Sequence, residues 1–124
     1  MTPLILPADL RTPEINFNPE TGRLLVRGIS IPENAERFFK PLFDWMTDFN
    51  KQFKGNVEFT LSLTYFNTPS VRHFLEIMLG LIRSHGERLT IIWEYEEDDD
   101  EILDRGKEMS DVLKFPFSYK LIVE

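Results

Sequence analysis

The junction over residues 63–72, Leu-Thr-Tyr-Phe-Asn-Thr-Pro-Ser-Val-Arg, constrains the fold most strongly, because the hydrophobic period changes there. Before it, apolar side chains recur at every second position from Val57 to Tyr65, which is the period of a half-buried strand. After it, the spacing of three and four residues from Val71 to Ile82 predicts an amphipathic helix that ends at Gly86. The chain therefore passes directly from a strand into a helix.

Thr68 lies at the centre of this junction. Pro69 is best placed at the first helical position, where its missing N–H leaves no bond unmade, so Thr68 is predicted to be the N-cap. Unpaired backbone donors and the helix dipole favour an anion at a helix N-terminus, so a phosphate on Thr68 would meet suitable surroundings. The alternative is a purely structural cap, because threonine is a common N-cap in any protein.

Length and composition limit the classes of protein that remain. With 124 residues, 42% of them hydrophobic, the chain can bury one core, so we expect a single domain over residues 1–124. The absence of cysteine excludes disulfides and thiolate chemistry, and we expect a cytoplasmic protein. The proline-broken start, Met1 to Pro7, is not a secretion signal, and no apolar run reaches membrane-spanning length, so we expect no membrane insertion.

The formal net charge of -7 argues against nucleic acid as a partner, because its phosphates would be repelled. The same charge fits a protein partner with a basic surface. A simple contribution to solubility is the alternative explanation.

The segments before the junction predict a hairpin and a long helix. Residues 14–18 and 23–28 flank a Pro-Glu-Thr-Gly turn, and residues 4–6, between two prolines, suit an edge strand. An apolar stripe from Glu33 to about Phe53 predicts a helix with Asn34 as its N-cap, and Pro41 predicts a kink or a break inside it. We interpret the phenylalanines of this stripe as core, with a ligand pocket as the alternative.

The segments after the junction predict two more strands with a helix between them. Alternation predicts strands over residues 89–95 and 117–123. Between them, the acidic segment Glu94 to Glu101 lacks the ligand spacing and central glycine of a calcium loop, so we expect no metal site. Asp98 to Asp100 are predicted to cap the next helix, which Gly106 weakens, and a docking surface for a basic partner is the alternative role of the segment.

The order of these elements predicts the fold class. Helical crossovers join parallel strands, whereas the hairpin adds antiparallel pairing, so we expect an α/β fold with a mixed sheet. Each strand shows one apolar face, so the helices should pack chiefly on one side of the sheet, in two layers.

The sequence offers little support for catalysis or a cofactor. His73 and His85 fall on one predicted helix without metal or triad spacing, so each is interpreted as a surface or helix-end residue. We identify no glycine-rich phosphate loop and no paired carboxylates that can be placed in a pocket. We therefore expect a binding protein and a substrate of other enzymes, not an enzyme.

Four motifs carry a family resemblance: Ile31-Pro32-Glu33-Asn34, Phe66-Asn67-Thr68, Trp93-Glu94-Tyr95 and Phe115-Pro116-Phe117. In order and distance they resemble the SiaC family of regulatory phosphoproteins, along almost all 124 residues. The resemblance implies a fold like the anti-sigma-factor antagonist (STAS) domain. It also implies that Thr68 is the phosphoryl acceptor. Family members often carry serine where this chain has Pro69.

The resemblance further implies three protein partners: a kinase that acts on Thr68, a PP2C-type phosphatase, and a diguanylate cyclase that the unmodified protein activates. The cyclase would connect the chain to cyclic di-GMP and biofilm formation. Residues near the acceptor are expected to contact partners, with Ser70 and His73 exposed; the full set is Asn34, Asn67, Pro69, Ser70, Arg72 and His73.

Two alternatives to the cyclase hypothesis remain at this stage. An anti-sigma-factor antagonist would use the same switch with a transcriptional output. An enzyme or small-ligand binder would use a pocket near Asn34, Tyr65 and Thr68.

Overall fold

The computed structural model describes residues 1–123, which form a six-stranded sheet covered by helices. The strands are β1 (Leu4–Leu6), β2 (Glu14–Phe17), β3 (Arg23–Ser30), β4 (Val57–Phe66), β5 (Leu89–Glu96) and β6 (Ser118–Ile122). The helices are α1 (Ala35–Gln52), α2 (Thr68–His85) and α3 (Asp100–Leu113), with a short 3-10 helix, η1 (Gly86–Arg88). These elements confirm the order predicted from the hydrophobic periods.

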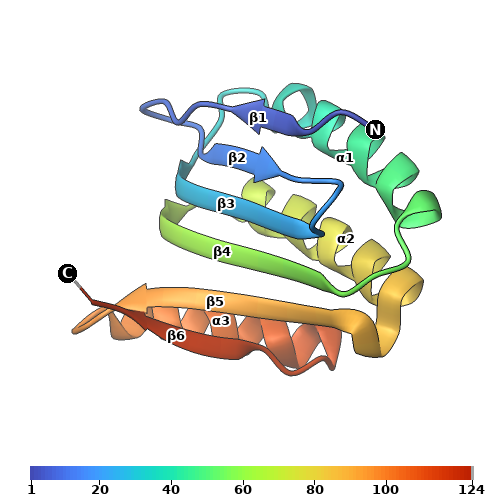
Figure 1. Ribbon diagram of the computed structural model, residues 1–124. Helices are drawn as coiled ribbons and strands as arrows, with labels where there is room; N and C mark the ends of the chain where they lie inside the picture. The colour runs from blue at the N-terminus through green and yellow to red at the C-terminus, as the bar shows by residue number, and fades with distance from the viewer. Residues whose placement is uncertain (124) are drawn as a thin grey trace.

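The sheet is mixed, and its strands lie in the order of the sequence, β1-β2-β3-β4-β5-β6. The hairpin and the edge strand pair antiparallel, whereas β3, β4, β5 and β6 are parallel. Crossovers between parallel strands are almost always right-handed, so crossovers that always advance in one direction place their helices on the same face. Figure 1 shows α1, α2 and α3 together behind the sheet, which confirms the predicted two-layer arrangement.

The core fills the space between the sheet and the helix layer. Alternate side chains of the strands meet the apolar stripes of the helices, and many of the largest buried side chains are aromatic. Within α1, Phe39 and Phe49 are fully buried, which confirms that its phenylalanine stripe packs in the core.

Helix α1 begins at its predicted cap, because Asn34 Oδ1 accepts a hydrogen bond from the Arg37 N–H at 3.0 Å. Of the two outcomes predicted at Pro41, a kink or a break, the structure excludes the break, since the helix continues through this residue to Gln52. Pro41 and Arg37 are both exposed, so water can satisfy the Arg37 carbonyl that a proline cannot bond.

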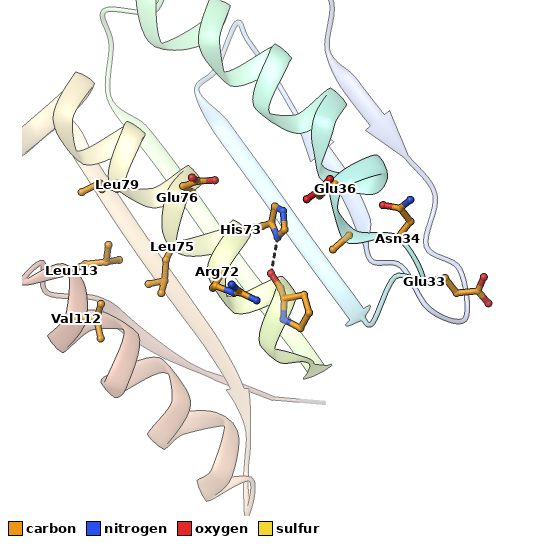
Figure 2. Close-up of a pocket in the computed structure, with 12 residues that line it drawn as sticks. Glu33, Asn34, Glu36, Arg72, His73, Leu75, Glu76, Leu79, Val112 and Leu113 are labelled. Carbon is orange, nitrogen blue, oxygen red and sulfur yellow. Dashed lines mark hydrogen bonds between the residues drawn. The ribbon is translucent and has the colours of Figure 1, made fainter.

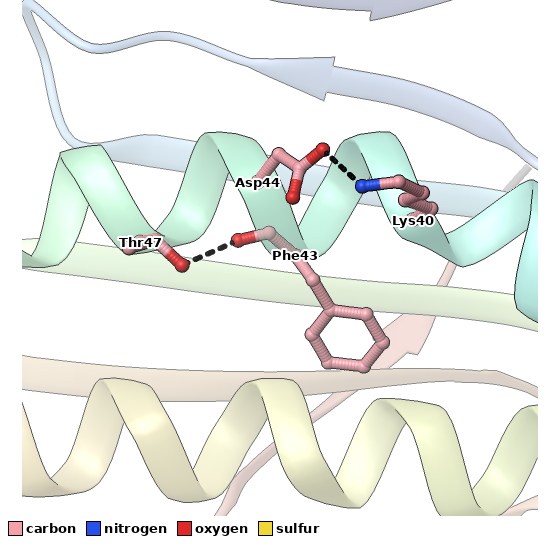
Figure 3. A network of polar contacts seen from close by, with 4 residues as sticks. All are labelled: Lys40, Phe43, Asp44 and Thr47. Atoms are coloured by element: carbon pink, nitrogen blue, oxygen red, sulfur yellow. Dashed lines mark hydrogen bonds and ion pairs between the residues drawn. The ribbon is translucent and has the colours of Figure 1, made fainter.

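The two sides of α1 differ in chemistry (Figure 3). Lys40 and Asp44 form an ion pair of 3.0 Å one turn apart on its exposed side. Phe43 points instead toward α2, and its carbonyl accepts a hydrogen bond from the Thr47 hydroxyl at 2.9 Å. The helix thus presents charge to solvent and aromatic rings to its neighbour.

A β-bulge in β4 overturns one sequence prediction. Gly28 of β3 pairs with Leu63, but Ile29 pairs with Tyr65, so Thr64 is an extra residue in β4. An extra residue reverses the alternation of faces beyond it. Tyr65 is therefore 55% exposed, although the alternating pattern placed it on the buried face, and Phe66 is buried instead.

Helix α3 starts as predicted, because Asp99 is its N-cap and accepts a hydrogen bond from the Ile102 N–H. Gly106 does not interrupt the helix. A Cβ atom at this position would come within 2.6 Å of the Trp93 ring, so only glycine lets the helix approach the sheet this closely. Trp93 also donates from Nε1 to the Ile102 carbonyl at 2.9 Å.

Candidate functional site

Helix α2 begins one residue earlier than its sequence indicates. Asn67 has extended backbone angles (φ -100°, ψ 173°), and its Oδ1 accepts a hydrogen bond from the Ser70 N–H at 3.1 Å. Asn67 is therefore the N-cap, and the prediction that Thr68 caps the helix is wrong. Thr68 is the first helical residue and Pro69 the second, where a proline is still tolerated because first-turn N–H groups lack helical acceptors.

The Thr68 side chain is exposed at this helix start, directly after the end of β4. No acidic residue occurs in the first turn of α2, so nothing on the helix itself neutralises the positive end of its dipole there. Arg72 lies one turn further along, and it is also exposed. The position is accessible to another protein and favourable for a negative charge.

Ser70 differs from its predicted role as an exposed contact residue, because its side chain is fully buried. Its Oγ donates to the Ser30 carbonyl at 2.9 Å and lies 2.8 Å from the Ser30 Oγ. The first turn of α2 faces the end of β3 on this side, so Ser70 points inward. The expectation of an exposed Ser70 is therefore wrong.

A groove with a volume of about 770 Å³ lies beside the start of α2 (Figure 2). It runs between the start of α1, one side of α2 and the end of α3. Four of the predicted contact residues line this groove: Asn34, Pro69, Arg72 and His73. Tyr65 and Thr68 are not among its lining residues, so the pocket expected near Asn34, Tyr65 and Thr68 is displaced toward α3.

The groove is lined by both apolar and acidic side chains. Its apolar residues are Ala35, Leu75, Leu79, Val112 and Leu113. Three glutamates line it as well, namely Glu33, Glu36 and Glu76, against a single cation, Arg72. Val112 is 69% exposed, so its side chain is available to a partner. A partner that covers this surface would bury apolar area and meet mostly negative charge.

His73 is half-buried between α1 and α2, so the expectation of an exposed ring is only partly correct. The ring stacks on Phe39 with centroids 4.6 Å apart and lies 5.8 Å from the Phe43 ring. Its Nδ1 is 2.7 Å from the Pro69 carbonyl, which can only accept, so Nδ1 carries a proton and donates. In the neutral ring, Nε2 is then left as an acceptor beside the groove.

His85, at the other end of α2, is a helix-end residue as predicted, but it is 3% exposed and does not lie on the surface. Arg88 Nη2 lies 3.3 Å from its Nδ1, and Asn50 Oδ1 lies 3.0 Å from its Nε2. Because arginine only donates, His85 Nδ1 accepts and Nε2–H donates to Asn50. Burial lowers the pKa of His85, and the charges of Arg88 and Lys54 lower it further.

Neither metal binding nor membrane crossing is indicated in the part of the chain that the structure describes. Over residues 1–123, no three His, Asp or Glu side chains are grouped so that they could hold a metal ion. No helix within that range is both long and apolar enough to span a bilayer.

Comparison with known proteins agrees with the fold and with the family resemblance of the sequence. A model of the SiaC family of regulatory phosphoproteins matches residues 6–122. The chain belongs to this family. Among curated proteins, it is 29% identical over 120 residues to an uncharacterised protein of Pseudomonas aeruginosa strain UCBPP-PA14, and the match covers 95% of each.

Solved structures of the SiaC family have the same fold. Apo-SiaC from Pseudomonas aeruginosa is 30% identical, with a TM-score of 0.86 over 97% of this chain and 99% of that one. A second similar chain, 29% identical with a TM-score of 0.88, comes from the complex of the diguanylate cyclase SiaD with its activator SiaC; the match covers 96% of this chain and 99% of that chain. These structures confirm the predicted α/β fold class, and the family match confirms the resemblance noted in the sequence.

Proposed function

We propose that this SiaC-family protein is a phosphorylation-switched activator of a diguanylate cyclase, controlling cyclic di-GMP and biofilm formation. The unmodified form binds and activates the cyclase. A partner kinase phosphorylates Thr68, which releases the cyclase, and a PP2C-type phosphatase removes the phosphate so that binding is restored. The carrying observation is that Asn34, Pro69, Arg72 and His73 line one groove that begins beside Thr68. The SiaC–SiaD complex of Pseudomonas aeruginosa supports a cyclase as the partner.

The chemistry of the groove suggests the kind of surface that the cyclase presents. The apolar residues that line the groove, such as Leu75 and Leu79, suit the apolar side of a helix. The three glutamates that line the groove, Glu33, Glu36 and Glu76, favour basic side chains on that helix. An amphipathic helix with a basic flank matches both features.

Phosphorylation is compatible with the fold of the free protein. A phosphate adds roughly -1.5 to -2 charges at neutral pH. At the N-terminus of α2 an anion is stabilised by about 0.3 to 1 kcal/mol. Arg72, four residues after Thr68 on the same helix, is placed to pair with the phosphate. The release mechanism therefore requires no large refolding.

At the interface the same charge would oppose binding. If the cyclase packs over this position, mismatched buried charge costs about 2 to 5 kcal/mol. Such a cost lowers affinity by well over tenfold, since about 1.4 kcal/mol corresponds to each factor of ten.

The test measures the affinity of the cyclase for the unmodified and the phosphorylated protein at one salt concentration. A pull-down with unmodified protein, compared with Thr68→Glu, first identifies the effector in the producing cells. Weaker binding by the phosphorylated form supports the switch, whereas equal or tighter binding rejects it. Recovery of an anti-sigma factor in place of a cyclase would instead support a transcriptional output.

Thr68→Ala should be unmodifiable, keep binding the cyclase and leave signalling constitutively on. Because Thr68 is not the N-cap, this change should alter the free energy of unfolding by less than about 0.5 kcal/mol. Urea denaturation and cyclase activity measured with and without kinase check both parts. Release of the alanine variant under phosphorylating conditions would contradict the assignment of Thr68.

The volume of the groove, about 770 Å³, also accommodates a small molecule and favours ligand binding as a second candidate function. Incubation of the purified protein with nucleotides separates the two candidates. Tight binding or turnover without any protein partner would favour the ligand hypothesis over the switch.

A further inference from the structure

The turn that carries Thr68 is tied at both ends to one carbonyl oxygen. The Ser30 carbonyl accepts a hydrogen bond from the Asn67 N–H at 3.2 Å and another from the Ser70 hydroxyl at 2.9 Å. Asn67 Oδ1 in turn accepts from the Ser70 N–H at 3.1 Å. The residues on either side of the Thr68-Pro69 pair are therefore linked to each other and to the end of β3.

The hydroxyl protons of the two serines have defined directions. The single proton of the Ser70 hydroxyl goes to the Ser30 carbonyl, so in the 2.8 Å contact between the hydroxyls Ser30 donates to Ser70. Both side chains are fully buried, where an unpaired hydroxyl would be costly. The two serines thus form a buried, hydrogen-bonded pair of neutral side chains, and this pair does not depend on surface charge.

The same carbonyl also joins the two loops that border the groove. Ser30 ends β3 and leads through Ile31 and Pro32 to Glu33 and Asn34 on one side of the groove. Ser70 belongs to the first turn of α2, next to Pro69 on the other side. A displacement of Ser70 would therefore move the Thr68 turn relative to the Asn34 loop.

We propose that Ser30 and Ser70 are positioning residues for phosphoryl transfer to Thr68, an inference that rests on the function proposed above. In the transfer, Thr68 Oγ1 forms a bond to the γ-phosphorus of ATP, the bond from that phosphorus to the bridging oxygen breaks, and ADP leaves. The hydroxyl proton passes to a base of the kinase. The serines touch none of these atoms; they hold the turn so that Thr68 projects outward in one orientation.

Because the turn is already held in place, the Thr68 hydroxyl needs little further ordering when the kinase docks. The rate of transfer depends on the alignment of this hydroxyl with the γ-phosphorus, and displacements of about 1 Å are enough to lower it. Loosening the turn should therefore lower the rate of transfer in the bound complex more than it weakens docking. The Ser70→Ala variant removes the hydroxyl that donates to the Ser30 carbonyl and also the acceptor of the Ser30 hydroxyl. Ser30→Ala removes one bond only, because its carbonyl remains.

The experiment follows phosphorylation of Thr68 by phosphopeptide mass spectrometry, using ATP and a lysate of the cells that produce the protein. Initial rates over a range of protein concentrations give the apparent maximal rate and KM. For Ser70→Ala we expect a maximal rate lowered roughly tenfold, with KM little changed. Ser30→Ala should show a smaller decrease of the same kind, and far-UV circular dichroism verifies that each variant is folded.

Ser110→Ala is the matched control, because the Ser110 hydroxyl also donates to a backbone carbonyl, that of Phe115, at 2.6 Å near the end of α3. This variant loses a hydroxyl-to-carbonyl hydrogen bond that does not involve the turn of Thr68, so it should retain the wild-type rate. Equal maximal rates for Ser70→Ala and wild type would overturn the inference, as would an equal decrease in Ser110→Ala. If Ser70→Ala does not fold, the Ser30→Ala rate decides. Wild-type protein that is never modified at Thr68 would instead refute the proposed function.

Discussion

The two ends of helix α2 are both anchored by buried polar side chains, but the anchors differ in chemistry. At the start, Ser70 bonds to the neutral hydroxyl and carbonyl of Ser30. At the end, His85 bonds to Asn50 and faces the Arg88 guanidinium. The first anchor contains no group that titrates near neutral pH, whereas the second contains an imidazole.

This difference explains how the start of the helix could receive a charge without losing its anchor. A phosphate on Thr68 would lie on the exposed side of the first turn, while the serine pair remains buried and neutral. At the other end, a positive charge on His85 would face the charge of Arg88 directly. We therefore expect the start of α2 to carry regulation and its end to carry stability, and four predictions test this contrast.

The largest expected effect is on stability, from His85→Ala. The ring is buried, packs 5.6 Å from the Phe49 ring and satisfies Asn50. Its loss should lower the free energy of unfolding by about 2 to 4 kcal/mol, through a cavity and an unpaired amide. Urea denaturation measures the loss. Phosphorylation of Thr68 well below the melting temperature should be unaffected, and a slowed reaction there would break the proposed division between the two ends.

The next effect concerns binding, and it compares two exposed arginines of the same helix. Arg72→Glu removes the guanidinium contact that the proposed interface assigns to Arg72, and this loss should weaken cyclase binding about tenfold, or about 1.4 kcal/mol, although the new carboxylate adds to the acidic groups that favour a basic partner. Arg83→Glu, in the last turn and outside the groove lining, is the control and should leave affinity nearly unchanged. Far-UV circular dichroism should be the same for both. Unchanged affinity in Arg72→Glu would place the interface elsewhere.

A third prediction compares the caps of α1 and α2. Asn67→Ala and Asn34→Ala each remove a side-chain acceptor at a helix start, so each should cost about 1 kcal/mol in urea denaturation. Only Asn67→Ala should also slow phosphorylation of Thr68, because Asn67 holds the turn that carries it. Equal phosphorylation rates for Asn67→Ala and wild type would reduce Asn67 to a structural cap.

The smallest expected effect is that of pH, because protonation of His85 disturbs its contacts but removes no packing. Its pKa is lower in the folded protein than the ordinary value of 6.5, owing to burial, Arg88 and Lys54. The unfolded chain therefore binds the proton more readily than the folded protein. The contribution of His85 to the free energy of unfolding is fully present above about pH 6.5 and is lost as pH falls through the folded-state pKa. The free energy of unfolding, measured by urea denaturation at a series of pH values below about 6.5, should fall more steeply with decreasing pH for wild type than for His85→Gln. An equal dependence on pH in both proteins would exclude His85 as the cause.

Much of the fold could be predicted because its signals are local. The alternation of β4, the apolar stripe of α1 and the caps Asn34 and Asp99 all depend on residues close in sequence. The prediction of Thr68 as the cap of α2 failed because the position of the cap depends on a contact with a distant residue. Asn67 and Thr68 both cap helices well, and the extended backbone of Asn67, held by the Ser30 carbonyl, decided between them.

Three further errors came from contacts between residues distant in sequence. The bulge that exposes Tyr65 is defined by the pairing of β4 with Gly28 and Ile29, which no property of β4 alone reveals. The burial of Ser70 depends on Ser30, forty residues earlier. The groove likewise requires α3 to approach α2, so the sequence indicated several of its residues but not Val112 or Leu113.

The order of the strands in the sheet has a consequence for how the protein folds as it is synthesised. Each strand from β2 to β6 pairs with the strand that precedes it in the chain, so its partner has already left the ribosome. Within residues 1–123, no strand has to insert between two earlier ones, and loop closure never spans more than one intervening helix and its short connections. The nascent chain can therefore extend the sheet one strand at a time, because each new strand pairs with the edge strand that was synthesised just before it.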